Sequence, residues 1–197
     1  MSQRLVLASS NAGKLREFNS LLADFEFEVI RQADLGVTDA EETGLSFVEN
    51  ALLKARNASQ ITGLAALADD SGLVVDALGG QPGIYSARFA GQPTNDAANN
   101  AKLLEALKNV SAEQRTARFH CCIVLVRHPT DPVPLIAEAS WEGMILNAIQ
   151  GQQGFGYDPL FYVPTHRCTA AELEATEKNR ISHRGQALQR LRALLAV

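Results

Sequence analysis

Residues 64–73 read Leu-Ala-Ala-Leu-Ala-Asp-Asp-Ser-Gly-Leu, and this stretch decides the fold of the chain. The apolar run predicts a buried strand that ends at the carboxylates of Asp69 and Asp70. Burying a charged carboxylate at such a position costs free energy unless a cation neutralises it, usually a divalent metal or a ligand that carries one. A turn that Asp69 merely caps is the alternative. Neighbouring side chains on a strand point to opposite faces, so we expect one carboxylate at the chemistry and the other in a supporting role.

Length and composition predict an ordinary soluble globular protein. The chain has 197 residues, of which 46% are hydrophobic and 20% are charged, enough for one large domain or two joined lobes. A net charge of −4 argues against a general nucleic-acid coat but leaves room for a small anionic ligand. The cysteines Cys121, Cys122 and Cys168 are expected to be reduced thiols. No signal peptide and no membrane-spanning run is apparent, so we expect a cytoplasmic protein without a membrane or nucleic-acid partner.

The amino-terminal region predicts a strand, a small polar loop and a helix. Residues 4–8 are apolar enough for a buried strand, and Ser-Ser-Asn-Ala-Gly-Lys follows over residues 9–14. Backbone N–H groups, hydroxyls and Lys14 at a helix N-terminus are typical of a phosphate site, although no Walker A motif is present. An N-cap by Ser10 or Asn11 with an exposed lysine is the simpler alternative. The helical spacing rests on Leu15, Phe18, Leu21 and Leu22.

The remaining periodicities predict a mixture of βα units and one β-hairpin. Ser46 and Glu49 have the spacing of a capping box, and so do Thr169 and Glu172, so each pair is expected to open a helix. The other expected elements are strands over 27–31, 116–127, 133–141 and 160–163, helices from Ser46 to about Thr62 and over 95–107, and a last helix that carries Ala187, Leu188, Leu191, Leu194 and Leu195.

Three further segments can be interpreted either functionally or structurally. Glu41 and Glu42 are either solvated charges or metal ligands. The glycine-rich loop over 151–159 presents Phe155 as a stacking platform for a base, or it is a turn anchored by buried rings. The basic cluster of residues 178–184 binds an anion or is a solvated turn. Together with the loop at Lys14, these segments match the requirements of a nucleoside triphosphate and its metal.

Six ordered motifs, spread over most of the chain, carry a resemblance to a known family. They are residues 9–14, residues 41–44 with Phe47, Glu49, Asn50, Ala51 and Lys54, then residues 68–73, 82–88 and 154–159, and finally 182–185 with Ala187. With these motifs the chain resembles the non-canonical purine NTP pyrophosphatases, also called the inosine triphosphate pyrophosphatase or XTP/dITP diphosphatase family, in its bacterial branch.

The resemblance implies a fold, an assembly and a reaction. The implied fold is α/β: a long mixed central sheet with flanking helices and two lobes around an active-site cleft, formed by residues 1–197 as a single nucleotide pyrophosphatase domain. The family is usually homodimeric. Its members hydrolyse deaminated purine nucleoside triphosphates (XTP, dITP and ITP) to the monophosphate and pyrophosphate with Mg²⁺.

The resemblance also implies roles for individual residues. Asp70 is expected to be the catalytic proton acceptor and a metal ligand, with Glu42 as a second metal candidate, and Lys14 and Lys178 are expected to hold phosphates. His183 and Arg184 are candidate donors to the oxygen at purine position 6, whereas the rejection of guanine, by Asp158 or by steric exclusion, stays undecided. The full set of expected substrate-binding residues is Ser9, Ser10, Asn11, Ala12, Gly13, Lys14, Ser71, Phe155, Gly156, Tyr157, Asp158, Lys178, His183 and Arg184.

Two other functions stay open at this point. A Maf-like nucleotide pyrophosphatase would share the phosphate loop and the metal acid but prefer other bases, and the phenylalanine loop and the Ser-His-Arg segment argue against it. A non-catalytic nucleotide-binding regulator would be expected to lose the metal acid, yet Asp70, Glu42 and Lys14 are all present. Binding without turnover would distinguish the regulator.

Overall fold

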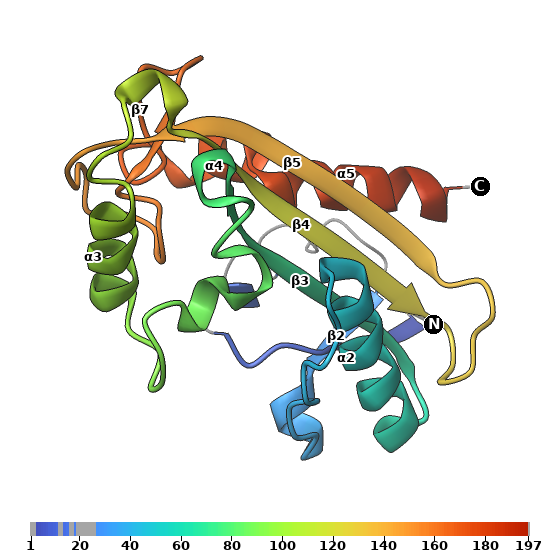
Figure 1. The fold of residues 1–197 in the computed structure, drawn as a ribbon. Helices are drawn as coiled ribbons and strands as arrows, with labels where there is room; N and C mark the ends of the chain where they lie inside the picture. Colours follow the sequence, from blue (N-terminus) through green and yellow to red (C-terminus); the bar gives the residue numbers. More distant parts are fainter. Residues whose placement is uncertain (1–2, 12–13, 16–17, 19–26, 197) are drawn as a thin grey trace. The chain divides into compact units, whose positions relative to one another are not determined.

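The computed structural model describes residues 3–11, 14–15, 18 and 27–196 (Figure 1). The strands are β1 (Gln3–Leu7), β2 (Phe27–Arg31), β3 (Ala65–Val75), β4 (Thr116–Val126), β5 (Leu135–Ile145), β6 (Phe161–Val163) and β7 (Cys168–Thr169). The α-helices are α2 (Phe47–Thr62), α3 (Asp96–Ala106), α4 (Ala175–Ile181) and α5 (His183–Leu195). Leu15 and Phe18 are helical as predicted, Lys14 of the predicted loop is helical as well, and Leu21 and Leu22 lie outside the described residues.

A seven-stranded mixed sheet forms the centre of the fold, which confirms the predicted class. The hydrogen-bonded order is β2-β1-β3-β4-β5-β6-β7. β1 runs parallel to both β2 and β3, whereas β6 is antiparallel to β5 and to β7. β4 and β5 are neighbours joined only by residues 127–134, a connection too short for a parallel crossover, so the predicted hairpin is confirmed.

The chain divides into two compact units, in agreement with the expected two lobes. The first unit contains residues 1–70, 121–139 and 184–197, and the second contains residues 71–120 and 140–183. The strands β3, β4 and β5 each contribute residues to both units. The expected cleft and the single-domain assignment over residues 1–197 stay predictions.

In the first unit, the alternation of side chains along the strands builds a core on each face of the sheet. Cys121, Ile123 and Leu125 of β4 join one apolar cluster, and Cys122 and Val124 join the other. α5 contributes Ala187, Leu188 and Leu191 to the first cluster, and α2 contributes Ala51, Ala55 and Ala58 to the second. Figure 1 accordingly shows the two helices on opposite sides of these strands. α2 begins where predicted, because the Ser46 side chain accepts a hydrogen bond from the Glu49 N–H.

The second unit has a single core rich in aromatic rings. Phe119, Trp141 and Phe161 pack together with ring centroids 4.6 to 6.4 Å apart. α3 covers this core through Leu103, and the Asn95 side chain caps the helix at the Ala98 N–H. The described part of the chain contains no helix long and apolar enough to cross a lipid bilayer.

Two local predictions were wrong. The strand at residue 65 does not end at the carboxylates, nor does Asp69 cap a turn; β3 continues through them to Val75, because lysines and an asparagine compensate both carboxylates within the sheet. The Thr169 and Glu172 pair does not open a helix. The Glu172 carboxylate accepts hydrogen bonds from the Thr169 N–H and hydroxyl as predicted for a cap, but this bond closes a turn after β7, and α4 begins only at Ala175.

Candidate active site

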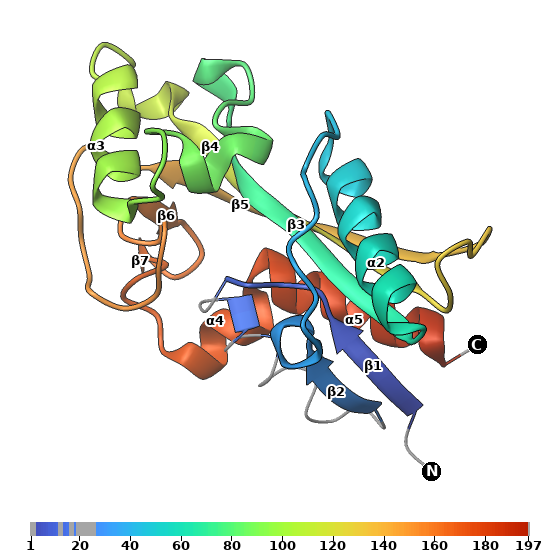
Figure 2. The same ribbon diagram turned by 90° about the horizontal axis from the view of Figure 1, so that it is seen from below.

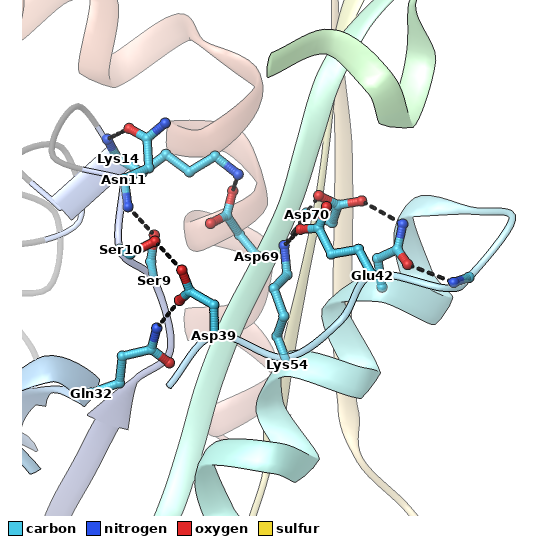
Figure 3. Close-up of polar contacts among 12 residues, drawn as sticks. Ser9, Ser10, Asn11, Lys14, Gln32, Asp39, Glu42, Lys54, Asp69 and Asp70 are labelled. Atoms are coloured by element: carbon cyan, nitrogen blue, oxygen red, sulfur yellow. Dashed lines mark hydrogen bonds and ion pairs between the residues drawn. The ribbon is translucent and has the colours of Figure 1, made fainter. Parts of the chain in front are cut away.

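Asp69 and Asp70 are consecutive residues of β3, and their side chains contact different partners, as the strand alternation predicts. Figure 3 shows Asp69 directed toward Lys14 of the amino-terminal loop and Asp70 directed toward Lys54 of α2. Both carboxylates are buried, with 1% and 5% of their residues' surface exposed. They belong to the first unit together with their partners.

Asp69 lies between two cations. Its Oδ2 is 2.9 Å from the Lys14 Nζ and 3.7 Å from an Nη2 of Arg184. Burial alone would raise the pKa of Asp69, but the charges of Lys14, Arg184 and Lys54 outweigh it and hold the pKa well below its usual range. The Arg184 guanidinium is itself buried and lies 5.7 Å from the centroid of the Phe18 ring. Asp69 is therefore ionised at neutral pH and forms ion pairs with two cations.

Asp70 has a less compensated environment. Its Oδ1 is 3.2 Å from the Lys54 Nζ, and its Oδ2 accepts a 3.3 Å hydrogen bond from the Asn50 amide. Lys54 is shared, because its Nζ is also 2.9 Å from Glu42 Oε1. Burial raises the pKa of Asp70, and the charges of Glu42 and Asp69 add to this against the opposing effect of Lys54 and Lys14. Asp70 is thus poised to accept a proton more readily than its neighbour.

Lys54 and Asn50 of α2 both contact Asp70. Burial would lower the pKa of Lys54, but the nearby carboxylates of Asp70, Asp69 and Glu42 raise it instead, so the ammonium stays charged. Asn50 lies one helical turn before Lys54, and its Oδ1 accepts the Gly44 N–H at 2.8 Å. Through Asn50 and Lys54, α2 therefore connects the segment of residues 42–44 to the carboxylate of Asp70.

Four ion pairs among the described residues join the carboxylates of Glu42, Asp69 and Asp70 to the cations of Lys14, Lys54 and Arg184. Among the described residues, no group of three or more His, Cys, Asp or Glu side chains could hold a metal ion. Glu42 and Asp70 nevertheless both pair with the Lys54 ammonium, at 2.9 and 3.2 Å, so the two carboxylates face one cationic position. Mg²⁺ commonly uses one or two carboxylates and completes its shell with water and substrate phosphates, so this donor set fits Mg²⁺.

The predicted phosphate loop is held by residues that the motif did not reveal. The Ser9 hydroxyl accepts from the Asn11 N–H at 3.3 Å, and the Asn11 Oδ1 accepts from the Lys14 N–H at 3.0 Å, as expected for a helix cap. The Ser10 hydroxyl donates to Asp39 at 2.6 Å, and Gln32 donates to the same carboxylate (Figure 3). Ala12 and Gly13 lie outside the described residues.

In the second unit, Asp158 organises the predicted aromatic loop. Its Oδ2 accepts the Phe155 N–H at 2.8 Å and the Lys178 ammonium at 2.7 Å, and that ammonium lies 5.1 Å from the centroid of the Phe155 ring. Gly154 has a φ of +80°, and a Cβ there would come within 2.1 Å of the Asp158 carboxylate, so only glycine fits. The structure thus unites Phe155, Asp158 and Lys178.

The other predicted residues of this region have structural neighbours. The His183 ring stacks on Phe119 with centroids 4.9 Å apart and planes 13° apart. The Tyr157 hydroxyl donates to the Ser86 carbonyl at 2.8 Å, and burial and the charge of Asp96 raise its pKa. Ser71 follows Asp70 in β3 and is half-buried. The roles of these residues toward a substrate stay predictions.

Comparison with known proteins identifies the family. The model of the Ham1 family matches residues 5–194. A protein of Xanthomonas campestris named dITP/XTP pyrophosphatase is 62% identical over 189 residues, covering 96% of this chain and 95% of that protein. A protein of the same name from Escherichia coli (strain K12) is 57% identical over 189 residues, covering 96% of each chain.

Solved structures agree with these sequence matches. A HAM1 protein from Coxiella burnetii superposes with a TM-score of 0.92 at 52% identity over 98% of both chains. A nucleoside-triphosphatase, dITP/XTP pyrophosphatase, from Mycobacterium abscessus gives a TM-score of 0.77 at 43% identity, covering 99% of this chain and 100% of that one. The protein is an α/β protein with a mixed sheet of the type that these relatives share. It belongs to the Ham1 family, and the resemblance seen in the motifs is confirmed.

Proposed function

We propose that this protein hydrolyses XTP, dITP and ITP to the monophosphate and pyrophosphate with the help of Mg²⁺. The observation that carries the proposal is the pair of unlike carboxylates in β3, one fixed in an ion cluster and one with a raised pKa beside a lysine and a second acid. The names of the relatives at 57% and 62% identity support the choice of substrate.

The residues of the first unit would bind the phosphates and activate water. Lys14 and Lys54 are cations that a triphosphate would attract away from their carboxylates, which would leave Glu42 and Asp70 to hold Mg²⁺. When bound, Mg²⁺ would neutralise negative charge on the phosphates and the leaving pyrophosphate. Asp70 would accept the proton of the water that attacks the α-phosphorus, because its carboxylate lies beside Lys54 and close to the second acid, Glu42.

The residues of the second unit would recognise the base and add a phosphate contact. Phe155 would stack on the purine, and Lys178 would hold the triphosphate. Donors directed at the position 6 oxygen would favour inosine and xanthine over adenine, because an amine there would leave buried donors unpaired. We assign that role to His183 of the second unit and to Arg184, which belongs to the first unit. Asp158 is occupied by the Phe155 N–H and Lys178, so its part in rejecting guanine would act through the loop that it holds.

Product analysis tests the proposed reaction. XTP, dITP and ITP are incubated with the protein and Mg²⁺ beside ATP and GTP, and pyrophosphate and orthophosphate are assayed separately. Monophosphate and pyrophosphate from the deaminated purines only would support both reaction and selectivity. Release of orthophosphate would indicate attack at the γ-phosphorus. Release of pyrophosphate from nucleotides with other bases would indicate a Maf-like specificity, and tight binding without turnover would indicate a regulator.

Replacing Lys178 tests the proposed phosphate contact. We expect Lys178→Ala to raise the apparent KM for dITP at least about tenfold, because it removes a charged hydrogen-bond donor. The exposed Lys108→Ala is the matched control and should leave KM unchanged, because Lys108 forms an ion pair with the equally exposed Glu105 at the protein surface. An unchanged KM in a folded Lys178→Ala protein would remove this residue from the site.

The assembly and the compartment are further parts of the proposal. We expect a homodimer, as the family resemblance implies, and light scattering of the purified protein would measure its mass. A cytoplasmic location is likewise expected, and fractionation of the source cells would test it.

A further inference from the structure

We propose that Asp96 and Asn100 of α3 are positioning residues that fix the loop carrying Phe155 and so set how well the base of the substrate is recognised. The inference rests on the proposed function for the role of Phe155, but the contacts that carry it are independent of any substrate. Asp96, Asn100 and the loop all belong to the second unit, where Figure 2 shows α3 beside the segment that precedes β6.

Both polar groups of one glycine are held by this helix. The Asp96 Oδ2 accepts the Gly156 N–H at 2.7 Å, and the Asn100 Nδ2 donates to the Gly156 carbonyl at 2.9 Å. Residues four apart lie on the same side of a helix, so Asp96 and Asn100 form a two-point clamp. The Gly156 N–H belongs to the peptide bond that Phe155 begins, so the clamp acts directly on the residue expected to stack on the base.

The loop needs such a clamp because its glycines leave the backbone free. Gly154 and Gly156 have φ angles of +80° and +62°, in the region that glycine adopts readily but at a cost in backbone entropy on ordering. Asp158 holds the Phe155 N–H, and Asp96 holds the Gly156 N–H, so carboxylates fix the amides on both sides of the Phe155 side chain. Without Asp96 only one of the two would remain.

Other contacts hold α3, which carries the clamp, in place. Asn99, the neighbour of Asn100, accepts the Ala90 N–H at 2.7 Å and donates to the Ala87 carbonyl at 3.0 Å. The helix is thereby tied to the preceding segment, and Leu103 anchors it in the core. Among the described residues, the Asn100 Oδ1 has no hydrogen-bond partner, so the bond to Gly156 is what orients this buried amide.

Asp96 contributes little to the core, which points to a positioning role. The residue is exposed, and its contact with Gly156 spans 60 positions of sequence. Substitution of an exposed residue outside the core seldom prevents folding. The loop can therefore be loosened through Asp96 in a folded protein, and Asn100 provides a second, buried variant.

The test measures amide exchange and kinetics on the same proteins. Hydrogen exchange of the Gly156 amide, followed by NMR, is compared among wild type, Asp96→Ala, Asp96→Asn and Asn100→Ala, with the exposed Glu105→Gln on the same helix as the matched control. We expect faster exchange in Asp96→Ala, and partial protection in Asp96→Asn, whose side-chain oxygen can still accept. In parallel, the KM for dITP should rise about tenfold in Asp96→Ala while kcat and inhibition by pyrophosphate, which has no base, stay near wild type.

Several results would overturn the inference. Unchanged exchange in Asp96→Ala and Asn100→Ala would show that the clamp does not hold the loop. Faster exchange with an unchanged KM and an unchanged preference for dITP over dATP would show that the held loop does not serve the base. A uniform loss, in which pyrophosphate inhibition weakens as much as dITP binding, would indicate a merely structural role. If wild type does not hydrolyse dITP, the proposed function fails, while the exchange measurement still decides the clamp.

Discussion

Asp70→Asn is expected to lower kcat for dITP about 1,000-fold while the protein stays folded. The amide has nearly the shape of the carboxylate but cannot take a proton from water. Burial raises the pKa of Asp70, which means that the folded protein disfavours its ionised form relative to the unfolded chain. That ionisation therefore costs stability once the pH exceeds the usual carboxyl pKa, and the amide removes the cost. We expect the Tm at pH 7 to be unchanged or higher.

The measurements that check this prediction are steady-state kinetics, calorimetric unfolding and direct binding of dITP. Asp34→Asn is the matched control, because Asp34 forms an exposed ion pair with Arg31 in the same unit. It should leave kcat and Tm as in wild type. If Asp70→Asn keeps more than about a tenth of the wild-type rate, Asp70 is not the proton acceptor. A large fall in Tm would instead mean that its contacts with Lys54 and Asn50 stabilise the fold.

The sequence predicted the features that depend on residues close together in the chain, namely the bounds of single elements, helix caps and the alternation of side chains along a strand. The strand over residues 27–31 and the capped helix that starts after Ser46 have the predicted bounds, because apolar periodicity and cap spacing are local signals. The opposite directions of Asp69 and Asp70 followed from strand alternation alone. In the same way, the asparagine that caps α3 stands at the position where the helix was expected to begin.

The rest depends on contacts between distant positions. β3 continues through two carboxylates because Lys14 and Lys54 come from other segments to neutralise them, and no local signal shows this. The support of Ser10 by Asp39 and of Gly156 by Asp96 also spans long stretches of chain, 29 and 60 residues. The four-residue spacing of Asp96 and Asn100 marks a polar helix side, but it does not identify the loop that the side contacts.

The largest loss of stability is expected for Asp69→Asn, at about 3–5 kcal/mol in the free energy of unfolding. Asp69 is fully buried, and its carboxylate faces the cations of Lys14 and Arg184. The amide removes the negative charge and leaves the buried Arg184 and the partly buried Lys14 facing a neutral side chain whose N–H₂ group repels them. Denaturant unfolding at pH 7 measures the difference from wild type, and the exposed pair of Asp34 with Arg31 again gives the control in Asp34→Asn, which should unfold as wild type does.

The pH dependence provides a second, independent check on Asp69. Its pKa is lowered in the folded protein, so its contribution to stability is complete above the unfolded pKa of about 4 and declines as the pH falls toward the folded value. The difference between wild type and Asp69→Asn should therefore be constant from pH 7 to about pH 5 and narrow below pH 4. A difference that stays constant down to about pH 2.5, which is about 1.5 units below the unfolded pKa, would mean that the lost free energy comes from packing rather than from charge. In that case the ion pairs of Asp69 with Lys14 and Arg184 would not stabilise the fold. The assignment of a structural role to Asp69 and a catalytic role to Asp70 would then lose its support.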